Sequence, residues 1–287
     1  MAAWQDKYWN SADGLRLHYR DYAGPHERAP LLCIPGLTRN AADFEPVADH
    51  VAGQWRVIAV DLRGRGLSEN DPKPERYSPP AYAADLMKLL DQLGIADAVF
   101  VGTSLGGLVT MVIAATDSER IAGALLNDIG PDVDAEGIDR IAGYVGTDTR
   151  FATWDDIVAS LKARNGDKFP RWDDAAWHRL ARRTARETGG TIGFAYDMAI
   201  ADYFDRSRTA PVFDAWPLWR SLVGRPVTLL HGEISDLLSA ATARRMIEEV
   251  PDAELVVVPD VGHAPSLEEP ESLAALDRLL ARVLAAA

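Results

Sequence analysis

Cysteine is almost absent from this chain of 287 residues, which contains only Cys33. No disulfide can form within the chain, and this usage is typical of a reducing compartment. Apolar runs also stay well short of the roughly 18 residues that a membrane helix needs. The first residues do not combine a basic stretch with an apolar core, so the pattern predicts no signal peptide. We therefore expect a cytoplasmic protein that does not bind membranes.

Metal and nucleotide motifs are missing as well. The six histidines form no HExxH pattern, and a single cysteine cannot build a zinc ribbon. No Walker A sequence occurs, and no GxGxxG follows a predicted strand. The sequence thus predicts neither a metal site nor a bound cofactor.

Basic residues are outnumbered by acidic ones. Lys and Arg total 30 and Asp and Glu total 43, which gives a formal charge of −13. This balance argues against nucleic acid as a partner, because binding phosphates requires a basic face. It also favours neutral or weakly polar substrates over polyanions. A hydrophobic fraction of 47% is ample for a large buried core.

Strand and helix patterns alternate along most of the chain. Asn40 is a predicted N-cap, with Asp43 placed as in a capping box, and Gly94 is placed to end a helix. Such alternation indicates a parallel sheet covered on both faces, with its ligand site at the carboxyl ends of the strands. The predicted strands are 15–22 (half-exposed), 31–34, 56–60, 98–101, 123–126, 227–230 and 254–258, and the predicted helices are 40–51, 81–93, 105–115, 240–249 and 272–286.

The alternation stops after Pro131. Residues 132–214 show helical patterns and no convincing buried strand, so we expect a helical insertion into a core made of residues 1–131 and 215–287. Large aromatic residues in such an insertion either fill its own core or line a pocket. We expect one or two of Trp154, Trp172 and Trp177 to line the pocket, and Trp154 is our candidate for substrate contact.

The segment Gly102-Thr103-Ser104-Leu105-Gly106-Gly107 carries the strongest chemical signal. It is a G-x-S-x-G pattern between a predicted strand and a predicted helix, which is the context of a serine nucleophile on a sharp turn. The small residues let the backbones approach closely, and the helix start directs free N–H groups at a developing oxyanion. Ser104 is therefore the candidate nucleophile.

A serine nucleophile needs a base, and the base needs an orienting acid. His263 follows the last predicted core strand, and Asp236 lies in the loop after the strand before it, with Glu233 as a local competitor. The order Ser, acid, His favours Asp236 as the acid. Asp128, at the end of the strand before the insertion, is the alternative.

These segments, together with Pro35-Gly36-Leu37-Thr38 and Asp61-Leu62-Arg63-Gly64-Arg65-Gly66-Leu67-Ser68, resemble the α/β-hydrolase superfamily over nearly the whole chain. The resemblance implies an α/β fold with an eight-stranded, mostly parallel sheet and a cap over the site. It also implies an oxyanion hole made by the N–H groups of Leu37 and Leu105. Many relatives have His-Gly where this chain has Pro35-Gly36, but backbone donors survive that change.

The expected activity is hydrolysis of a small, largely apolar carboxylic ester through an acyl-enzyme, with no cofactor. Arg39 follows the oxyanion segment and is a candidate substrate contact. The same triad serves lactonases and C–C bond hydrolases, and some members of the superfamily are small-ligand receptors, so these remain alternatives. Ser104 argues against epoxide hydrolases and haloalkane dehalogenases of this fold, because their nucleophile is an aspartate. The oligomeric state is left open.

Overall fold

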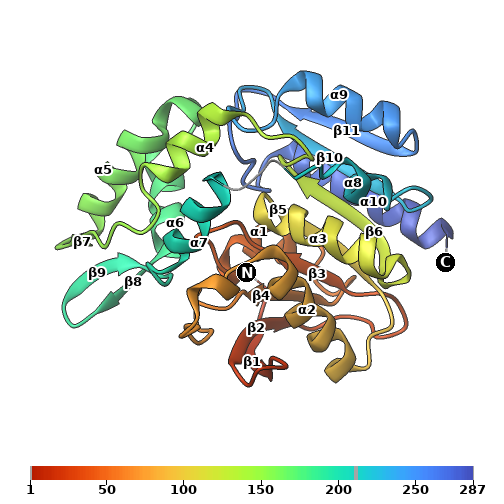
Figure 1. Cartoon of the computed structure of the whole chain (residues 1–287), viewed down its shortest axis with the longest axis horizontal. Coiled ribbons are helices and arrows are strands. Elements are labelled where there is room, and N and C mark those ends of the chain that lie inside the picture. The colour runs from red at the N-terminus through yellow and green to blue at the C-terminus, as the bar shows by residue number, and fades with distance from the viewer. Residues whose placement is uncertain (1, 210–212, 287) are drawn as a thin grey trace.

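The structure is a computed structural model that describes residues 2–209 and 213–286. Its centre is an eight-stranded sheet in the order β1-β2-β4-β3-β5-β6-β10-β11 (Figure 1). β2 runs antiparallel to both of its neighbours, and the other pairs are parallel, which confirms the predicted α/β-hydrolase sheet. The strands are β1 Trp4–Asn10, β2 Arg16–Tyr22, β3 Leu31–Ile34, β4 Val57–Asp61, β5 Ala98–Thr103, β6 Ile121–Asn127, β10 Val227–Gly232 and β11 Ala253–Val258.

Both faces of the sheet are covered by helices. Successive side chains of a strand point to opposite faces, so Leu31 and Cys33 pack on one side while Leu32 and Ile34 pack on the other. The first side is closed by α1 Glu45–His50 and α10 Pro270–Ala286. The second side is closed by α2 Pro79–Leu93, α3 Leu105–Thr116, α8 Trp216–Arg220 and α9 Ala240–Glu249. Burial raises the pKa of the Cys33 thiol, so it stays protonated.

The elements largely follow the predicted ranges, with several differences. The hairpin strand β1 was not predicted, and β2 is mostly buried rather than half-exposed, because its His18 ring bonds Asp61 at 2.7 Å and Asp6 at 3.0 Å. Asn40 does cap the helical segment, accepting a hydrogen bond from Ala42 N–H, and that segment opens with a 3₁₀ turn, η1 Ala41–Phe44. The predicted capping box is wrong, because Asp43 pairs with Arg39 instead.

The insertion between β6 and α8 forms a separate layer, seen in green at the left of Figure 1. We call residues 132–214 the cap. Its helices are α4 Ala135–Ala142, α5 Trp154–Asn165, α6 Asp174–Thr184 and α7 Ile200–Thr209. It also holds a three-stranded antiparallel sheet that was not predicted, made of β7 Arg150–Phe151, β9 Thr191–Phe194 and β8 Ala185–Thr188. Short 3₁₀ turns elsewhere are η2 Pro74–Arg76, η3 Ser118–Arg120 and η4 Gly166–Lys168.

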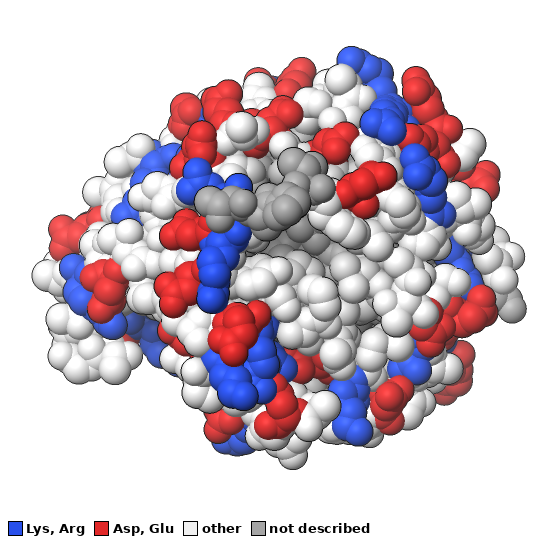
Figure 2. Space-filling view, viewed as in Figure 1, with Lys and Arg blue, Asp and Glu red and all other residues white. Residues whose placement is uncertain are grey.

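Charged side chains of both signs are interspersed on the face in Figure 2, with uncharged surface between them. The net charge of −13 is therefore not gathered into one acidic patch on this face. Within the described part of the chain, no helix combines the length and apolar character needed to cross a bilayer.

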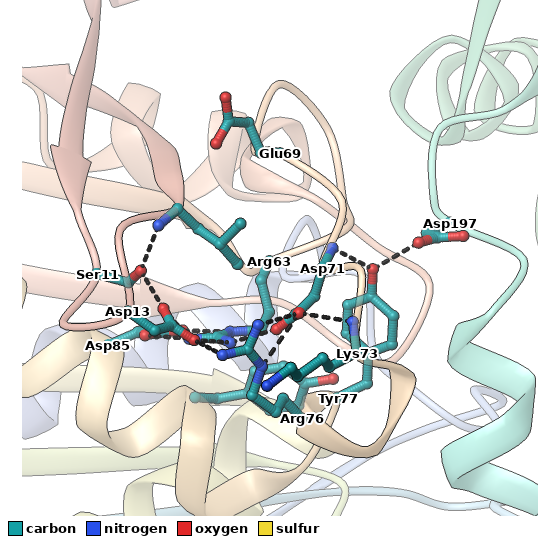
Figure 3. A network of polar contacts seen from close by, with 12 residues as sticks. Ser11, Asp13, Arg63, Glu69, Asp71, Lys73, Arg76, Tyr77, Asp85 and Asp197 are labelled. Carbon is teal, nitrogen blue, oxygen red and sulfur yellow. Dashed lines mark hydrogen bonds and ion pairs between the residues drawn. The ribbon is translucent and has the colours of Figure 1, made fainter.

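The cap is attached to the core through the loop between β4 and α2. Gly66 N–H donates to Ala195 at 2.9 Å, and Asp197 N–H donates to Gly64 at 2.7 Å. The hydroxyl of Tyr77 donates to the Asp197 carboxylate at 2.5 Å (Figure 3). These bonds fix one side of the cap over the carboxyl ends of the strands.

A buried guanidinium holds the same loop in place. Arg63 makes two hydrogen bonds to Asp85, at 2.8 and 2.6 Å, and also contacts Asp71 at 2.5 Å and Asp13 at 3.0 Å (Figure 3). Burial acts to raise the pKa of Asp13, but hydrogen bonds from Ser11 and Arg63 and the arginine charge lower it to about 2. Arg63 is thus a structural residue, enclosed by three carboxylates.

We expect Arg63→Met to lower the free energy of unfolding by about 3 to 5 kcal/mol at pH 7, because it leaves the buried carboxylate of Asp85 without its counter-charge. Urea unfolding monitored by tryptophan fluorescence measures this change. Arg278→Met is the control, since Arg278 is half-exposed and, among the described residues, pairs only with Glu254. Exposed pairs contribute about 0 to 1 kcal/mol. Equal effects of the two substitutions would contradict the structural role of Arg63.

Candidate active site

Ser104 lies on the turn between β5 and α3 with φ 52° and ψ −114°, a strained conformation for a residue with a side chain. The flanking glycines are needed for packing. A Cβ at Gly102 would lie 2.5 Å from the Gly106 backbone, and a Cβ at Gly106 would overlap the Ile34 carbonyl. The predicted nucleophile turn is therefore present, and its geometry presents the serine hydroxyl at the end of the strand.

His263 lies in the loop after β11 and reaches Ser104 directly. Its Nε2 is 2.9 Å from Ser104 Oγ, so the ring can accept the hydroxyl proton. Its Nδ1 is 2.9 Å from Asp128 Oδ2. With the proton on Nδ1, the ring donates to the carboxylate and accepts from the serine, which is the arrangement of a general base.

Asp128 directly follows β6 and is fully buried. Besides His263, its carboxylate accepts hydrogen bonds from Gly232 N–H at 2.9 Å, Ser235 Oγ at 2.6 Å and His231 Nδ1 at 3.3 Å. Burial acts to raise the pKa of Asp128, but the bonds from the two histidines and the serine lower it below the usual aspartate value. Asp128 is therefore ionised at neutral pH.

The expectation that Asp236 orients His263 is wrong in this structure. Asp236 turns toward the cap, where Arg140 Nε and Nη2 bind its carboxylate at 2.5 and 2.8 Å. The backbone explains this direction, because Gly137 N–H at the start of α4 donates to Asp236 O at 2.9 Å. Glu233, the other acid of this loop, is exposed and accepts from Asp260 N–H.

The residues predicted to supply the oxyanion donors, Leu37 and Leu105, lie beside Ser104. A Cβ added at Gly36 would be 3.8 Å from Ser104 Cβ, so the backbone that leads into Leu37 lies next to Ser104. Leu37 also lines the cavity. Leu105 is the first residue of α3, and N–H groups in the first turn of a helix have no acceptor within the helix. Arg65 Nε donates to Leu37 O at 2.9 Å and so holds the loop that follows β3 in place.

A cavity of about 450 Å³ opens above Ser104 between the core loops and the cap. Arg39 lines it as expected, although its guanidinium is engaged by Asp43. Trp172 also lines it and stacks on Phe169 with ring centroids 4.2 Å apart. Trp177 is buried in the cap core instead.

The proposed contact of Trp154 with substrate is wrong in this structure, because Trp154 does not line the cavity. Its ring instead contacts Arg182 on α6, whose guanidinium carbon lies 3.7 Å from the ring centroid. Two cap residues that the sequence did not single out, Tyr144 and Arg164, do line the cavity. Tyr144 follows α4 and Arg164 lies near the end of α5, so only the tertiary structure of the cap brings them together and no local pattern could have marked them. Across residues 2–209 and 213–286, no three or more His, Cys, Asp or Glu side chains gather as a metal site would require.

The chain is similar to known hydrolases over most of its length. A model of the alpha/beta hydrolase family matches residues 31–276. A 3-hydroxybutyrate-oligomer hydrolase from Cupriavidus necator is 33% identical over 90% of each chain. A 2-(acetamidomethylene)succinate hydrolase from Mesorhizobium japonicum is 31% identical over 84% of each. The crystal structure of an alpha/beta hydrolase from Novosphingobium aromaticivorans shares 50% identity and a TM-score of 0.94, covering 98% of this chain and 99% of that one.

The ion pair of Asp236 gives a pH-dependent prediction. Burial acts to raise the pKa of Asp236, but the bonds and charge of Arg140 lower it overall. The ionised form therefore stabilises the fold above the usual aspartate pKa of about 4, and this contribution is lost as pH falls through the lowered value. Asp236→Asn should reduce the free energy of unfolding by about 1 to 3 kcal/mol at pH 7.

Urea unfolding of wild type and Asp236→Asn at pH 7 and at pH 3 measures this difference. It should shrink at the lower pH, since the native carboxylate begins to lose its charge there. A gap that is unchanged or larger at pH 3 would contradict the ionic role. Glu254→Gln, which removes a half-buried acid paired with half-exposed Arg278, provides the comparison.

Proposed function

Because the chain belongs to the α/β-hydrolase family, we propose that it hydrolyses a small carboxylic ester through an acyl-enzyme formed on Ser104. The observation that carries this proposal is the unbroken series of contacts from Ser104 Oγ through the His263 ring to Asp128. That series supplies a nucleophile, a base and an orienting charge in one place.

In the first step, Ser104 Oγ attacks the ester carbonyl carbon and His263 Nε2 takes the hydroxyl proton. The carbonyl oxygen becomes an oxyanion that accepts hydrogen bonds from Leu37 N–H and Leu105 N–H. The C–O bond to the alcohol then breaks, and His263 returns the proton to the leaving oxygen. Asp128 stabilises the imidazolium throughout without taking its proton.

In the second step, His263 removes a proton from water, and the resulting hydroxide adds to the acyl carbon. The tetrahedral intermediate collapses, Ser104 leaves with the proton from His263, and the carboxylic acid is released. The chain's own groups perform each proton transfer, so the reaction requires no cofactor.

The names of the relatives support an ester as the bond that is cleaved, and they also include a compound with an amide bond. The Cupriavidus relative is named for 3-hydroxybutyrate oligomers, and hydroxy acids are joined to one another by ester bonds. The Mesorhizobium relative is named for 2-(acetamidomethylene)succinate, which contains an amide. We favour the ester because several of the lining residues are apolar, Leu37, Ile141 and Pro265 among them.

A fluorophosphonate probe should label the wild-type protein, and Ser104→Ala should abolish labelling. The phosphorus reacts with the activated serine oxygen, so labelling reports the nucleophile without requiring the natural substrate. Intact-mass spectrometry measures the adduct. Ser207→Ala, at an exposed serine that does not line the cavity, should still be labelled. A wild type that stays unlabelled would contradict the proposal.

Nitrophenyl esters of graded acyl length, assayed beside a lactone and a C–C substrate, separate the alternatives. Steady turnover of esters that is lost in Ser104→Ala supports the proposed activity. Faster turnover of the lactone or the C–C substrate would replace the ester by that bond. Tight binding with at most one slow turnover would instead indicate a small-ligand receptor.

Asp128→Asn should lower kcat by about 10³- to 10⁴-fold, because an amide cannot hold His263 in the required tautomer or stabilise the imidazolium. Asp236→Asn should retain most of the activity, since Asp236 binds Arg140 and not His263. Steady-state kinetics on a nitrophenyl ester compares the two, with thermal unfolding as a check on folding. The reverse pattern would restore Asp236 as the acid.

A further inference from the structure

The cavity is richer in positive charge than the chain as a whole. Six arginines line it, against four carboxylates, Asp43, Asp173, Glu268 and Glu269. The chain overall has a charge of −13. The lining arginines are Arg39, Arg140, Arg164, Arg171, Arg179 and Arg183.

Five of these six arginines are neutralised within the protein. Arg39 pairs with Asp43, Arg140 with Asp236 and Arg171 with Asp260. Arg179 pairs with Glu268, and Arg183 pairs with Glu268 and, at 3.7 Å, with Glu45. The two remaining lining carboxylates are also occupied. Asp173 caps α6, and Glu269 accepts hydrogen bonds from Ser266 and Ser272.

Arg164 is the exception. In the part of the chain that the structure describes, its guanidinium forms no ion pair and no hydrogen bond. It is half-buried at the end of α5, with the Tyr144 ring centroid 5.8 Å away and the Phe194 ring centroid 5.7 Å away. Both rings line the same cavity. Ring faces attract a cation, so these contacts hold the guanidinium in place while they leave its N–H groups free. A bound anion can accept hydrogen bonds from these N–H groups and supply the missing counter-charge.

Neighbouring groups strengthen this interpretation. Arg140 Nη1 donates to Asn165, the residue next to Arg164, so the two arginines belong to one wall of the cavity. The Tyr144 hydroxyl has no hydrogen-bond partner in the described ranges. Burial raises its pKa although Arg140, Arg39 and Arg164 act to lower it, so the hydroxyl keeps its proton and can donate. A planar guanidinium with a hydroxyl donor nearby suits a carboxylate.

We propose that the substrate is an ester that also bears a free carboxylate, and that Arg164 binds this carboxylate while Ser104 attacks the ester. One unpaired guanidinium matches one negative charge, which favours a monoanion. This inference rests on the proposed ester hydrolysis and specifies its substrate class. Arg164 is then a specificity-determining residue, and its effect falls on the binding of the acidic group.

Two matched pairs of esters test the proposal. Monoethyl glutarate and ethyl glutaramate differ only by carboxylate against amide on the acyl side. 3-Acetoxypropanoate and 3-acetoxypropanamide differ in the same way on the alcohol side. In at least one pair, the wild type should show a kcat/KM about 10- to 100-fold higher for the carboxylate, as expected for a charged hydrogen bond.

Arg164→Gln should remove this preference by raising KM for the carboxylate much more than KM for the amide. Arg164→Lys, which keeps the charge, should restore part of it. Lys162→Gln is the matched control, because Lys162 lies on the same helix and pairs with Asp174 outside the cavity. It should leave both substrates unaffected.

The outcomes separate the two proposals. Equal use of carboxylate and amide by the wild type, or equal loss for both in Arg164→Gln, overturns the carboxylate inference while Ser104-dependent hydrolysis stands. If no ester is cleaved, calorimetric titration of Ser104→Ala with the same four compounds decides. Tighter, Arg164-dependent binding of the carboxylates then supports the inference although ester hydrolysis fails, and equal binding overturns it.

Discussion

The buried carboxylate of Asp128 is the constraint on which the site depends. A fully buried negative charge is tolerable only when several donors satisfy it. Those donors come from the end of β10, from the loop that follows it and from the loop after β11. Satisfying this one charge therefore draws three segments of the chain together. The orientation of His263 is a consequence of that packing.

The order of strands in the sheet explains why an acid that follows β6 can contact His263. β6 lies beside β5, which Ser104 follows, and beside β10, whose other neighbour β11 precedes His263. Parallel strands end at the same edge, so residues following β6 and β10 both start near the histidine. The order of residues along the chain favoured Asp236, whereas the structure places Asp128 against His263. Asp236 instead binds Arg140 on the cap, and no sequence pattern around Asp236 reveals that partner.

The same distinction separates what the sequence could predict from what it could not. The buried strands were predictable because an apolar run such as Leu31–Ile34 has no place except between two covered faces. The serine turn was predictable because its glycines meet backbone atoms that no side chain could accommodate. The small cap sheet was missed because β8 is largely exposed and carries no apolar alternation. Trp154 was misplaced because helical packing within the cap decides which tryptophan faces the cavity.

Net charge was a poor guide to the site for a related physical reason. A formal charge summed over the chain describes long-range association, and salt screens it within about 10 Å. A ligand in the cavity instead meets individual groups in a partly desolvated space, where one unpaired guanidinium outweighs many distant carboxylates. Most arginines of the cavity are paired with carboxylates of the protein. The number of charges in the cavity, like the net charge of the chain, therefore does not say which charged group can bind a substrate. What selects a substrate is the group left without a partner, and the pairing pattern identifies that group as Arg164.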